Sequence, residues 1–544
     1  MAAPSSSDRG YAAAVDALNT LQSNAATLEA IRKNGGKMND LFIPEMVEYV
    51  SRIGYTQDDL NRLNVVHITG TKGKGSTSAF CDSLFRQLDV HKPGGQPAKV
   101  GLFTSPHMCA VRERIRINGL PIPEDMFAKY FWQVWDRLAE NPQRKHEITP
   151  LRPVYFRFLT LLAYHVFLQE EVDATILEVG IGGKYDSTNV VPKPLVTAIT
   201  QLGLDHTALL GNTVEEIAVQ KGGIFKKGAP ALSWARQPGR AIQELERVAK
   251  EAGTQLETVD LRPEISTGDI KLGLPGVHQR SNASLAVVIL ERFLESEAAR
   301  AVFSAPSSSS EPSQSLAEWQ RRGIEQARWP GRCQTVPSKQ DPQVTWFLDG
   351  AHTTDSLSVC LNWFVDSQLS SPAKQKQRTF IFNCTNGRSA PELLTAVLSR
   401  IESDLEAQGV SPSSGDEGGA YPRARGFFDR VIFCTNITFS SGGWASDLAS
   451  KAIDPNDLSA LVVQRDLESA WKSLLGSGSP GPEVLIKASI QDAIGHVREV
   501  ARKAGDGVTQ DVLVTGSLHL VGGVMAHLKE EGSLDDALVS TVSP

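Results

Sequence analysis

Short apolar runs and longer stretches of helical periodicity alternate along this chain of 544 residues. The short runs are rich in β-branched residues and stop at small or polar residues, which predicts buried strands. Between them, apolar residues recur every three or four positions, which predicts amphipathic helices. Strands that alternate with helices through short connections favour an α/β fold with a doubly wound, mainly parallel sheet. In the first part of the chain the expected strands are 65–69, 100–103, 111–119 (half-exposed), 174–180 and 195–201, and the expected helices are 11–32, 123–138, 154–168, a short one after Pro44 and one that starts at Thr213.

A second alternating unit follows a connector that contains Trp329-Pro330-Gly331-Arg332. Its expected strands lie at 344–350, 379–382, 431–434, 484–487 and 512–515. Because the chain is too long for one ordinary domain, we predict two domains: an N-terminal domain over 1–327, a linker over 328–336 and a smaller C-terminal α/β domain over 337–544. The Ser- and Pro-rich stretch 304–315 is predicted to be a disordered insertion, and 409–419 a low-complexity loop.

The most informative stretch is the one where the run Val65–Thr69 meets the segment Gly70-Thr71-Lys72-Gly73-Lys74-Gly75-Ser76-Thr77. Glycines let backbone N–H groups turn toward an anion, and the start of the following helix adds favourable potential. Lys74 could reach outer phosphates, and the Ser76 hydroxyl suits Mg²⁺. The segment is shorter than the usual G-x-x-x-x-G-K-[ST] loop, so a glycine-rich hairpin with incidental lysines is the alternative. The preceding strand and following helix favour an ATP site.

Composition and charge argue against several other classes of protein. The formal net charge of −7 argues against a nucleic-acid surface as the main function. The six cysteines have no C-x-x-C spacing, which predicts reduced thiols and no zinc site. No apolar run approaches the roughly 20 residues that span a bilayer. The N-terminus lacks the apolar core of a secretory signal, so we expect a cytoplasmic protein; its Ser/Ala-rich start leaves an additional mitochondrial location open.

Four polar residues follow or end a predicted strand: Ser76, Ser105, Glu178 and His206. The carboxyl ends of parallel strands gather at one edge of a sheet, where ligands bind. Taken alone, His206 is better explained as a hydrogen-bonded histidine at a strand end. Glu178 alone could be a surface carboxylate, but the apolar strand that carries it makes exposure unexpected. Their convergence therefore predicts a ligand site.

In their order along the chain, these motifs resemble the folylpolyglutamate synthase family of Mur ligase-like amide ligases, in its eukaryotic type. The resemblance covers roughly residues 11–528. The segments that carry it are 69–76, Ser105-Pro106-His107, 177–183 with 186–189, Leu204-Asp205-His206, 220–225, His278-Gln279 with Asn282, 329–332, Asp349-Gly350-Ala351-His352 and 515–520.

This resemblance implies a two-domain fold, with an N-terminal P-loop ATPase domain and a smaller Rossmann-like C-terminal domain. It implies an ADP-forming tetrahydrofolate:L-glutamate γ-ligase. In that reaction ATP phosphorylates the terminal γ-carboxylate of a reduced folate, and the amino group of L-glutamate attacks the acyl phosphate. The implied partners are reduced folate as mono- and polyglutamate, L-glutamate and ATP, with Mg²⁺ and a monovalent cation as cofactors. We expect neither a nucleic-acid partner nor a membrane span. We expect the protein to be a monomer.

The resemblance also assigns roles to individual residues. Oxygen donors suit magnesium as a hard cation, whereas an imidazole such as that of His206 is an unusual ligand. The implied cofactor-binding residues are Gly70, Thr71, Lys72, Gly73, Lys74, Gly75, Ser76, Thr77, Gln279, Asn282, Arg332, Asp349 and His352; the implied metal ligands are Ser76, Ser105, Glu178 and His206; the implied catalytic residues are Lys74, His206 and Lys221.

Several assignments keep an alternative. Lys221 matches a lysine that can be carbamylated in Mur-type ligases; a carbamate would support the magnesium site, whereas an ammonium would stabilise phosphate directly. Arg332 matches a triphosphate contact that moves with domain closure, or else is a solvated linker cation. The basic run Arg112, Arg114 and Arg116 could guide an anionic folate tail, but a solvated strand face is the more usual explanation of such a run.

Two rival functions share parts of the pattern. A dihydrofolate synthase acting on dihydropteroate has the same fold and chemistry, but Lys72 stands where bacterial relatives usually have Asn and favours the polyglutamate-adding type. A non-catalytic ATP-binding module would not need Glu178, His206 and Lys221. The loop Asn383–Pro391 departs from the family pattern by lacking its acidic residues, which leaves a glutamate-binding role there open; Ser517 and His519 are further candidates for it.

Overall fold

The computed structural model describes residues 9–22, 40–145, 149–306, 315–370, 375–384, 389–412, 420–441, 447, 460–476, 481–505 and 507–534. The described residues form two compact units. The first contains the residues up to His107 and those from Arg112 to Trp329; the second contains Met108–Val111 and the residues from Pro330 onward. The change of unit between Trp329 and Pro330 lies inside the segment predicted to be a linker, although residues 334–337 already belong to a strand of the second unit.

The first unit is built on an eight-stranded sheet in the order β5-β4-β3-β6-β1-β7-β8-β9. The strands from β3 to β9 in this order are parallel, and the edge strands β4 and β5 are antiparallel. The strands are β1 (Val65–Thr69), β3 (Val100–Phe103), β4 (Ile115–Ile117), β5 (Leu120–Pro121), β6 (Ala174–Glu178), β7 (Val196–Ile199), β8 (Ala231–Trp234) and β9 (Leu256–Val259), with a separate antiparallel pair of β2 (Asp89–Val90) and β10 (Phe303–Ser304).

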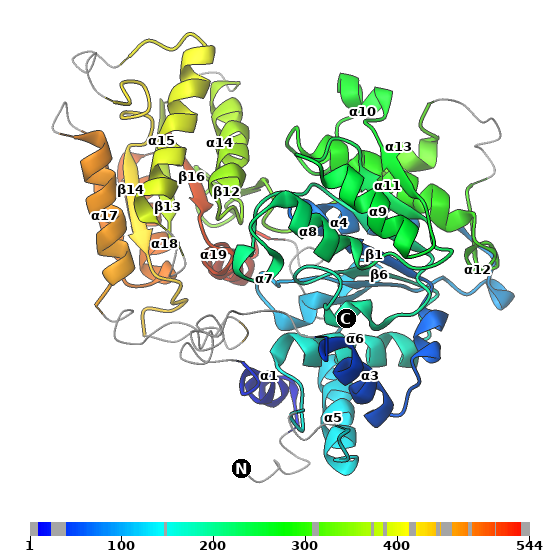
Figure 1. Cartoon of the computed structure of the whole chain (residues 1–544). Helices are drawn as coiled ribbons and strands as arrows, with labels where there is room; N and C mark the ends of the chain where they lie inside the picture. Colours follow the sequence, from blue (N-terminus) through cyan, green and yellow to red (C-terminus); the bar gives the residue numbers. More distant parts are fainter. Residues whose placement is uncertain are drawn as a thin grey trace. The chain divides into compact units, whose positions relative to one another are not determined.

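Helices cover both faces of this sheet (Figure 1). They are α1 (Tyr11–Asn19), α3 (Phe42–Arg52), α4 (Lys74–Phe85), α5 (Glu124–Glu140), α6 (Tyr155–Gln169), α7 (Thr207–Leu210), α8 (Val214–Gly222), α9 (Ala241–Glu251), α10 (Pro263–Thr267), α11 (Gln279–Leu294), α12 (Glu297–Arg300) and α13 (Glu318–Gln326), with 3₁₀ turns at 58–63, 93–95, 111–114 and 187–190. Successive strand residues point to opposite faces. In β1, Val66 and Ile68 therefore pack in the core under α4 and α11, while His67 points to the opposite face.

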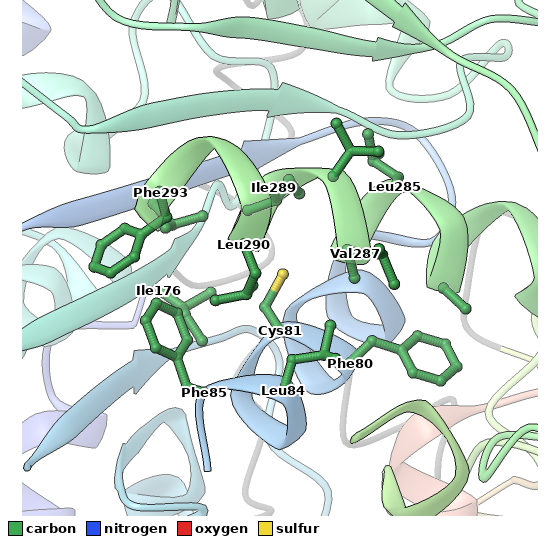
Figure 2. Packing of buried hydrophobic residues seen from close by; sticks show 14 of the residues in the cluster. Phe80, Cys81, Leu84, Phe85, Ile176, Leu285, Val287, Ile289, Leu290 and Phe293 are labelled. Carbon is green, nitrogen blue, oxygen red and sulfur yellow. The ribbon is translucent and has the colours of Figure 1, made fainter. Parts of the chain in front are cut away.

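The packing between α4 and α11 fixes the helix that begins at the glycine-rich loop. Figure 2 shows Phe80, Leu84 and Phe85 of α4 facing the side chains of α11, with Ile176 of β6 between Phe293 and Phe85. The rings of Phe85 and Phe293 meet edge to face with centroids 4.8 Å apart. Complete burial of one such side chain contributes about 1.5–3 kcal/mol. The start of α4 therefore sits on a rigid base.

The second unit has a six-stranded sheet in the order β11-β12-β16-β13-β14-β15, in which only β11 is antiparallel among the described strands. Its strands are β11 (Gln334–Pro337), β12 (Val344–Leu348), β13 (Gln375–Phe382), β14 (Arg430–Cys434), β15 (Glu483–Lys487) and β16 (Val508–Thr515). One face packs against α14 (Thr354–Leu369), α15 (Ala390–Ala407) and α17 (Val462–Leu475), and the other against α18 (Ile490–Ala504) and α19 (Leu518–Glu530). Met108 belongs to the hydrophobic core between the sheet and the helices α18 and α19.

The predicted α/β class with mainly parallel sheets is confirmed, and so are most of the predicted strands and helices. Two predictions are wrong. The first helix ends at Asn19 instead of Arg32, with residues 23–39 outside the described part. The segment 111–119 is not one half-exposed strand: a 3₁₀ turn at Val111–Arg114 precedes the three-residue strand β4. The two low-complexity predictions fall largely on residues 307–314 and 413–419, outside the described part. Among the described helices, none is both long and apolar enough to cross a membrane.

Candidate active site

The glycine-rich loop joins the end of β1 to the start of α4. Gly73 is the residue before the helix and has φ of +86°, a conformation that L-amino acids with a Cβ rarely adopt. A Cβ at Gly73 would also lie 2.2 Å from Oδ1 of Asn282. At Gly75, a Cβ would lie 3.3 Å from Nε1 of Trp329 and 3.7 Å from Oε1 of Glu178. Gly75, the unusual glycine between Lys74 and Ser76, is therefore explained by the side chains of Trp329 and Glu178, which lie close to the place that a Cβ would occupy.

The first part of the loop is held by the residues that follow β7. The N–H groups of Thr71 and Lys72 donate to the carbonyl oxygen of Gln201 at 2.9 and 3.0 Å. The hydroxyl of Thr200 donates to the carbonyl oxygen of Lys72 at 2.6 Å. The hydroxyl of Thr71 donates to the carbonyl oxygen of Gly203 at 3.0 Å. Two of the predicted cofactor-binding residues thus use their N–H groups to fix the loop. The residues Thr200 and Gln201 were not predicted, although their position at a strand end is a usable signal.

Two lysine side chains meet at one carbonyl oxygen of this loop. Nζ of Lys74 donates to O of Gly70 at 3.0 Å, and Nζ of Lys221, from the last turn of α8, donates to the same oxygen at 2.8 Å. Burial lowers the pKa of Lys221 well below its ordinary value, and the positive charge of Lys74 lowers it further. The carboxylates of Asp205 and Asp186 act in the opposite direction. This paired positive charge beside the start of α4 is suited to binding an anion.

Glu178 ends β6 and is buried next to the loop. Its Oε2 accepts the N–H of Ser105 at 3.0 Å, so the structure brings together two of the predicted metal ligands. Burial lowers the pKa of the Arg114 guanidinium, and the negative charge of Glu178 is among the groups that raise it. Nε of Arg114 donates to Nδ1 of His107 at 3.0 Å. Since a guanidinium can only donate, His107 accepts at Nδ1 and carries its proton on Nε2.

The first turn of α11 packs against the glycine-rich loop. Nε2 of Gln279 donates to Oγ of Ser76 at 3.2 Å, and Nδ2 of Asn282 donates to Oε1 of Gln279 at 2.9 Å. The hydroxyl of Thr77 donates to Oδ1 of Asn282 at 3.4 Å. Gln279 and Asn282, two of the predicted cofactor-binding residues, therefore lie beside the loop, where they hold its serine and threonine.

His206 lies in a different setting. It precedes α7 with φ of +49°, and its side chain is 46% exposed, 3.8 Å from a carboxylate oxygen of Asp205. Among the described residues, no three His, Cys, Asp or Glu side chains are arranged to hold a metal ion. The buried carboxylate of Glu178 with the hydroxyls of Ser76 and Ser105 offers the oxygen donors that magnesium prefers. The fit of magnesium therefore depends on these oxygens, and His206 adds a donor that this ion rarely uses.

The basic run predicted to be a solvated strand face is buried, so that interpretation is wrong. Nη1 of Arg112 donates to the carbonyl oxygen of Ile122 at 3.1 Å. Arg116 donates to the carbonyl oxygens of Glu113 and Gly119, and its guanidinium lies 5.0 Å from the ring centroid of Trp329. Periodicity alone could not show this burial, because the carbonyl oxygens that accept from Arg112 and Arg116 are brought to them only by the fold.

Three predicted residues lie in the second unit, around the end of β12. Asp349 accepts the N–H of Cys333 at 2.7 Å through Oδ2 and that of Ala351 at 2.8 Å through Oδ1. Nδ1 of His352 lies 3.0 Å from O of Gly350, and Nη1 of Arg332 donates to O of Gly331 at 3.0 Å. Asp349 thus holds two segments, one that carries Arg332 and one that carries His352. The loop Asn383–Pro391, whose sequence differs from the family pattern, includes residues 385–388, which lie outside the described part.

The fold and the glycine-rich loop define a two-unit α/β protein of the P-loop type. The chain is 40% identical to the folylpolyglutamate synthase of Neurospora crassa over 531 residues, which cover 97% of this chain and 93% of that protein. It is 40% identical to the folylpolyglutamate synthase of Candida albicans over 533 residues, 96% of this chain and 97% of that protein. No model of a protein family matches the chain.

Solved structures support the fold. A Mycobacterium tuberculosis folylpolyglutamate synthase complexed with ADP has a TM-score of 0.63 at 20% identity, covering 95% of this chain and 99% of that one. The apo form of L. casei FPGS has a TM-score of 0.62 at 21% identity, covering 96% of this chain and 100% of that one. With fungal relatives this similar over almost its whole length, the chain belongs to the folylpolyglutamate synthase family, in its eukaryotic type. The predicted family and fold class are confirmed.

Proposed function

We propose that this chain is an ATP-dependent ligase that adds L-glutamate in γ-linkage to tetrahydrofolate and its polyglutamates through an acyl phosphate. Family membership supports the reaction class. The observation that carries the assignment to this site is the convergence of Lys74 and Lys221 on the carbonyl oxygen of Gly70, in the same loop whose Gly75 lies beside the buried carboxylate of Glu178.

The chemistry requires two anions, a phosphoryl group and a carboxylate, to approach each other. Fixed positive charge lowers the cost of that approach, because it is already in place before the reaction begins. Lys74, Lys221 and the start of α4 supply such charge here. Magnesium, held by Glu178 with the hydroxyls of Ser76 and Ser105, would neutralise phosphoryl oxygens when bound. His206 is kept as a proposed catalytic residue because its exposed ring can meet a ligand.

Lys221 supports the site either as an ammonium or as a carbamate. Its lowered pKa enlarges the neutral fraction, and the neutral amine is the form that combines with CO₂. A carbamate presents two anionic oxygens, whereas an ammonium only donates. Mass analysis of gently handled protein distinguishes the two. Restoration of a Lys221→Ala variant by bicarbonate with short carboxylic acids would support the carbamate, and failure of restoration together with an unmodified mass would support the ammonium.

The central experiment incubates the protein with ATP, Mg²⁺, tetrahydrofolate and isotope-labelled glutamate, and reads added glutamate residues by mass. We expect products that depend on both ATP and glutamate, with release of ADP. Lys74→Ala should lower the rate at least about 100-fold, as expected when a transition-state cation is lost. Lys250→Ala, on the exposed side of α9, is the matched control and should retain full activity.

A parallel reaction with dihydropteroate tests the nearest alternative. Product from dihydropteroate alone would identify a dihydrofolate synthase. Product from neither acceptor, with ATP bound but not hydrolysed, would identify a non-catalytic binding module and refute the proposed function. Sedimentation of the active protein tests the expected monomer.

A further inference from the structure

A buried chain of hydrogen bonds lies on the opposite face of β1 from α4. Nε2 of His67 lies 2.9 Å from the hydroxyl oxygen of Thr188. That hydroxyl lies 2.6 Å from Oδ1 of Asp186, which also accepts the N–H of Thr188 at 2.9 Å. All three side chains are less than 5% exposed. The motif 186–189 stands out in the sequence, and the proposed reaction uses neither this motif nor His67.

The donors around Asp186 fix the direction of this chain. Burial raises the pKa of Asp186, but two backbone N–H groups, of Thr188 and Ile181, and the Thr188 hydroxyl donate to its oxygens and lower that pKa, which favours the ionised carboxylate. Since the one hydroxyl hydrogen of Thr188 goes to Asp186, His67 must donate from Nε2. Burial lowers the pKa of His67 to about 3, so the ring is neutral and has that single hydrogen to give.

Asp186 closes the loop that follows Glu178. Its Oδ2 accepts the N–H of Ile181 at 3.1 Å, three residues beyond Glu178. The next residue, Gly182, accepts the hydroxyl of Thr69 at 2.6 Å through its carbonyl oxygen. The loop is therefore attached both to the end of β1 and to Asp186.

The same loop packs against the last turn of α8. A Cβ at Gly183 would lie 2.7 Å from the carbonyl oxygen of Lys221, and the N–H of Lys184 donates to the carbonyl oxygen of Gln220 at 2.8 Å. Asn189 closes the arrangement by donating to the carbonyl oxygens of Lys184 and Gly223 at 3.0 Å each. A shift of this loop would therefore move the backbone that carries Lys221.

We propose that Asp186, held by Thr188 and His67, is a positioning residue: it fixes the loop after Glu178 and the end of α8, so that Glu178 stays beside Gly75 and Lys221 stays bonded to Gly70 of the glycine-rich loop. This inference rests on the proposed ligase function. Asp186 also places a buried negative charge near the Lys221 amine, which offsets part of the repulsion from Lys74.

The test compares Thr188→Val, which removes the hydroxyl while keeping the shape, with Thr188→Ser, which keeps the hydroxyl. Displacement of reacting groups by about 1 Å can cost 100-fold in rate. We expect kcat for glutamate addition to fall about 10- to 100-fold in Thr188→Val, with KM for ATP changed less than about threefold. Thr188→Ser should retain kcat within about twofold. Thr254→Val, which loses a similar hydroxyl bond to the Ala229 carbonyl oxygen, is the matched control and should leave kcat unchanged.

A second readout does not depend on catalysis. Lysines are labelled with an amine-reactive ester and each site is quantified by mass. Lys221 is buried, so its labelling should rise about tenfold in Thr188→Val if the hydroxyl holds this region in place, whereas labelling of exposed Lys250 should not change. If wild-type protein adds no glutamate, the proposed function fails and this labelling alone tests the positioning.

Equal kcat and equal Lys221 labelling in Thr188→Val and wild type would overturn the inference. Should Thr188→Val not fold, His67→Gln and His67→Phe put the same question, because only glutamine keeps an N–H donor for Thr188. We expect His67→Gln to be the more active of the two. Equal activity of these two folded variants would also overturn the inference.

Discussion

Gly73→Ala tests whether the glycine-rich loop is built against α11 as the structure shows. Two costs follow from the geometry. Alanine in the left-handed conformation of Gly73, at φ of +86°, costs about 1–2 kcal/mol. The new Cβ would lie 2.2 Å from Oδ1 of Asn282, so this side chain must move. Loss of the buried bonds that Asn282 makes to Gln279 and Thr77 costs about 1–3 kcal/mol more. The free energy of unfolding should therefore fall by roughly 2–5 kcal/mol.

Urea unfolding of four proteins measures this cost: wild type, Gly73→Ala, Asn282→Ala and the double variant. Because Asn282→Ala removes the colliding oxygen, the second substitution should cost less in the Gly73→Ala protein than in wild type. We expect a coupling free energy of about 1–2 kcal/mol between the two sites, within the range for residues in contact. Gly228→Ala is the control for backbone cost alone, since Gly228 has φ of +76° and open space around its Cα.

Additive effects at Gly73 and Asn282 would refute this reasoning, because two residues that do not meet cannot be coupled in this way. Equal losses of stability in Gly73→Ala and Gly228→Ala would refute it as well. The glutamate-addition assay adds a functional readout. We expect Gly73→Ala to lose about 100-fold in kcat, since the displaced Asn282 no longer supports Gln279 and Ser76.

Three further predictions concern the residues around the loop. Gly75→Ala places a Cβ 3.3 Å from Trp329 Nε1 and 3.7 Å from a Glu178 oxygen, so kcat should fall about tenfold with less than about 1 kcal/mol lost in urea unfolding; an unchanged kcat would contradict this. Burial lowers the folded-state pKa of Lys221 below that of the unfolded chain, so the unfolded chain binds more protons between the two values and stability rises with pH there. Between pH 7 and 10 the wild type should therefore gain more stability than Lys221→Met, and parallel pH curves for the two would be the contrary result. Arg114→Met removes a charge-assisted bond to His107 and should cost about 1.5–3 kcal/mol in urea unfolding, whereas a truly solvated arginine would cost almost nothing.

Local sequence signals predicted the elements that carry the loop. The β-branched run at Val65 gave β1, and the Thr213 and Glu216 pair gave the start of α8, where both halves of the capping box are present. Such signals act within a few residues of the chain. The predicted helix through Arg32 failed at Asn19 because apolar spacing marks a helical face without marking the point where the helix ends.

Contacts between distant residues could not be read from these patterns. Arg112, Arg114 and Arg116 alternate with apolar residues as a solvated strand face does, yet they are buried because carbonyl oxygens and His107 receive their N–H groups. The role of Thr200 at the loop depends on the pairing of β1 with β7, which brings it beside Lys72 from 128 positions away. The site residues that the sequence marks are those with unusual spacing; their partners become visible only in the fold.

The shared carbonyl oxygen of Gly70 explains why the loop needs support from two sides. Two unit positive charges about 5 Å apart repel by about 3 kcal/mol at an effective dielectric constant near 20. Lys74 and Lys221 both donate to this oxygen, so a free loop would separate them. The bonds to Gln201 and Thr200 hold the glycine-rich loop on the side of β7. On the other side, the packing of α8 against Gly183, in the loop after Glu178, holds Lys221. The same repulsion contributes to the lowered pKa of Lys221, and an anion placed between the two amines would favour the charged form of Lys221, so the favourable energy appears when the ligand binds and not in the empty protein.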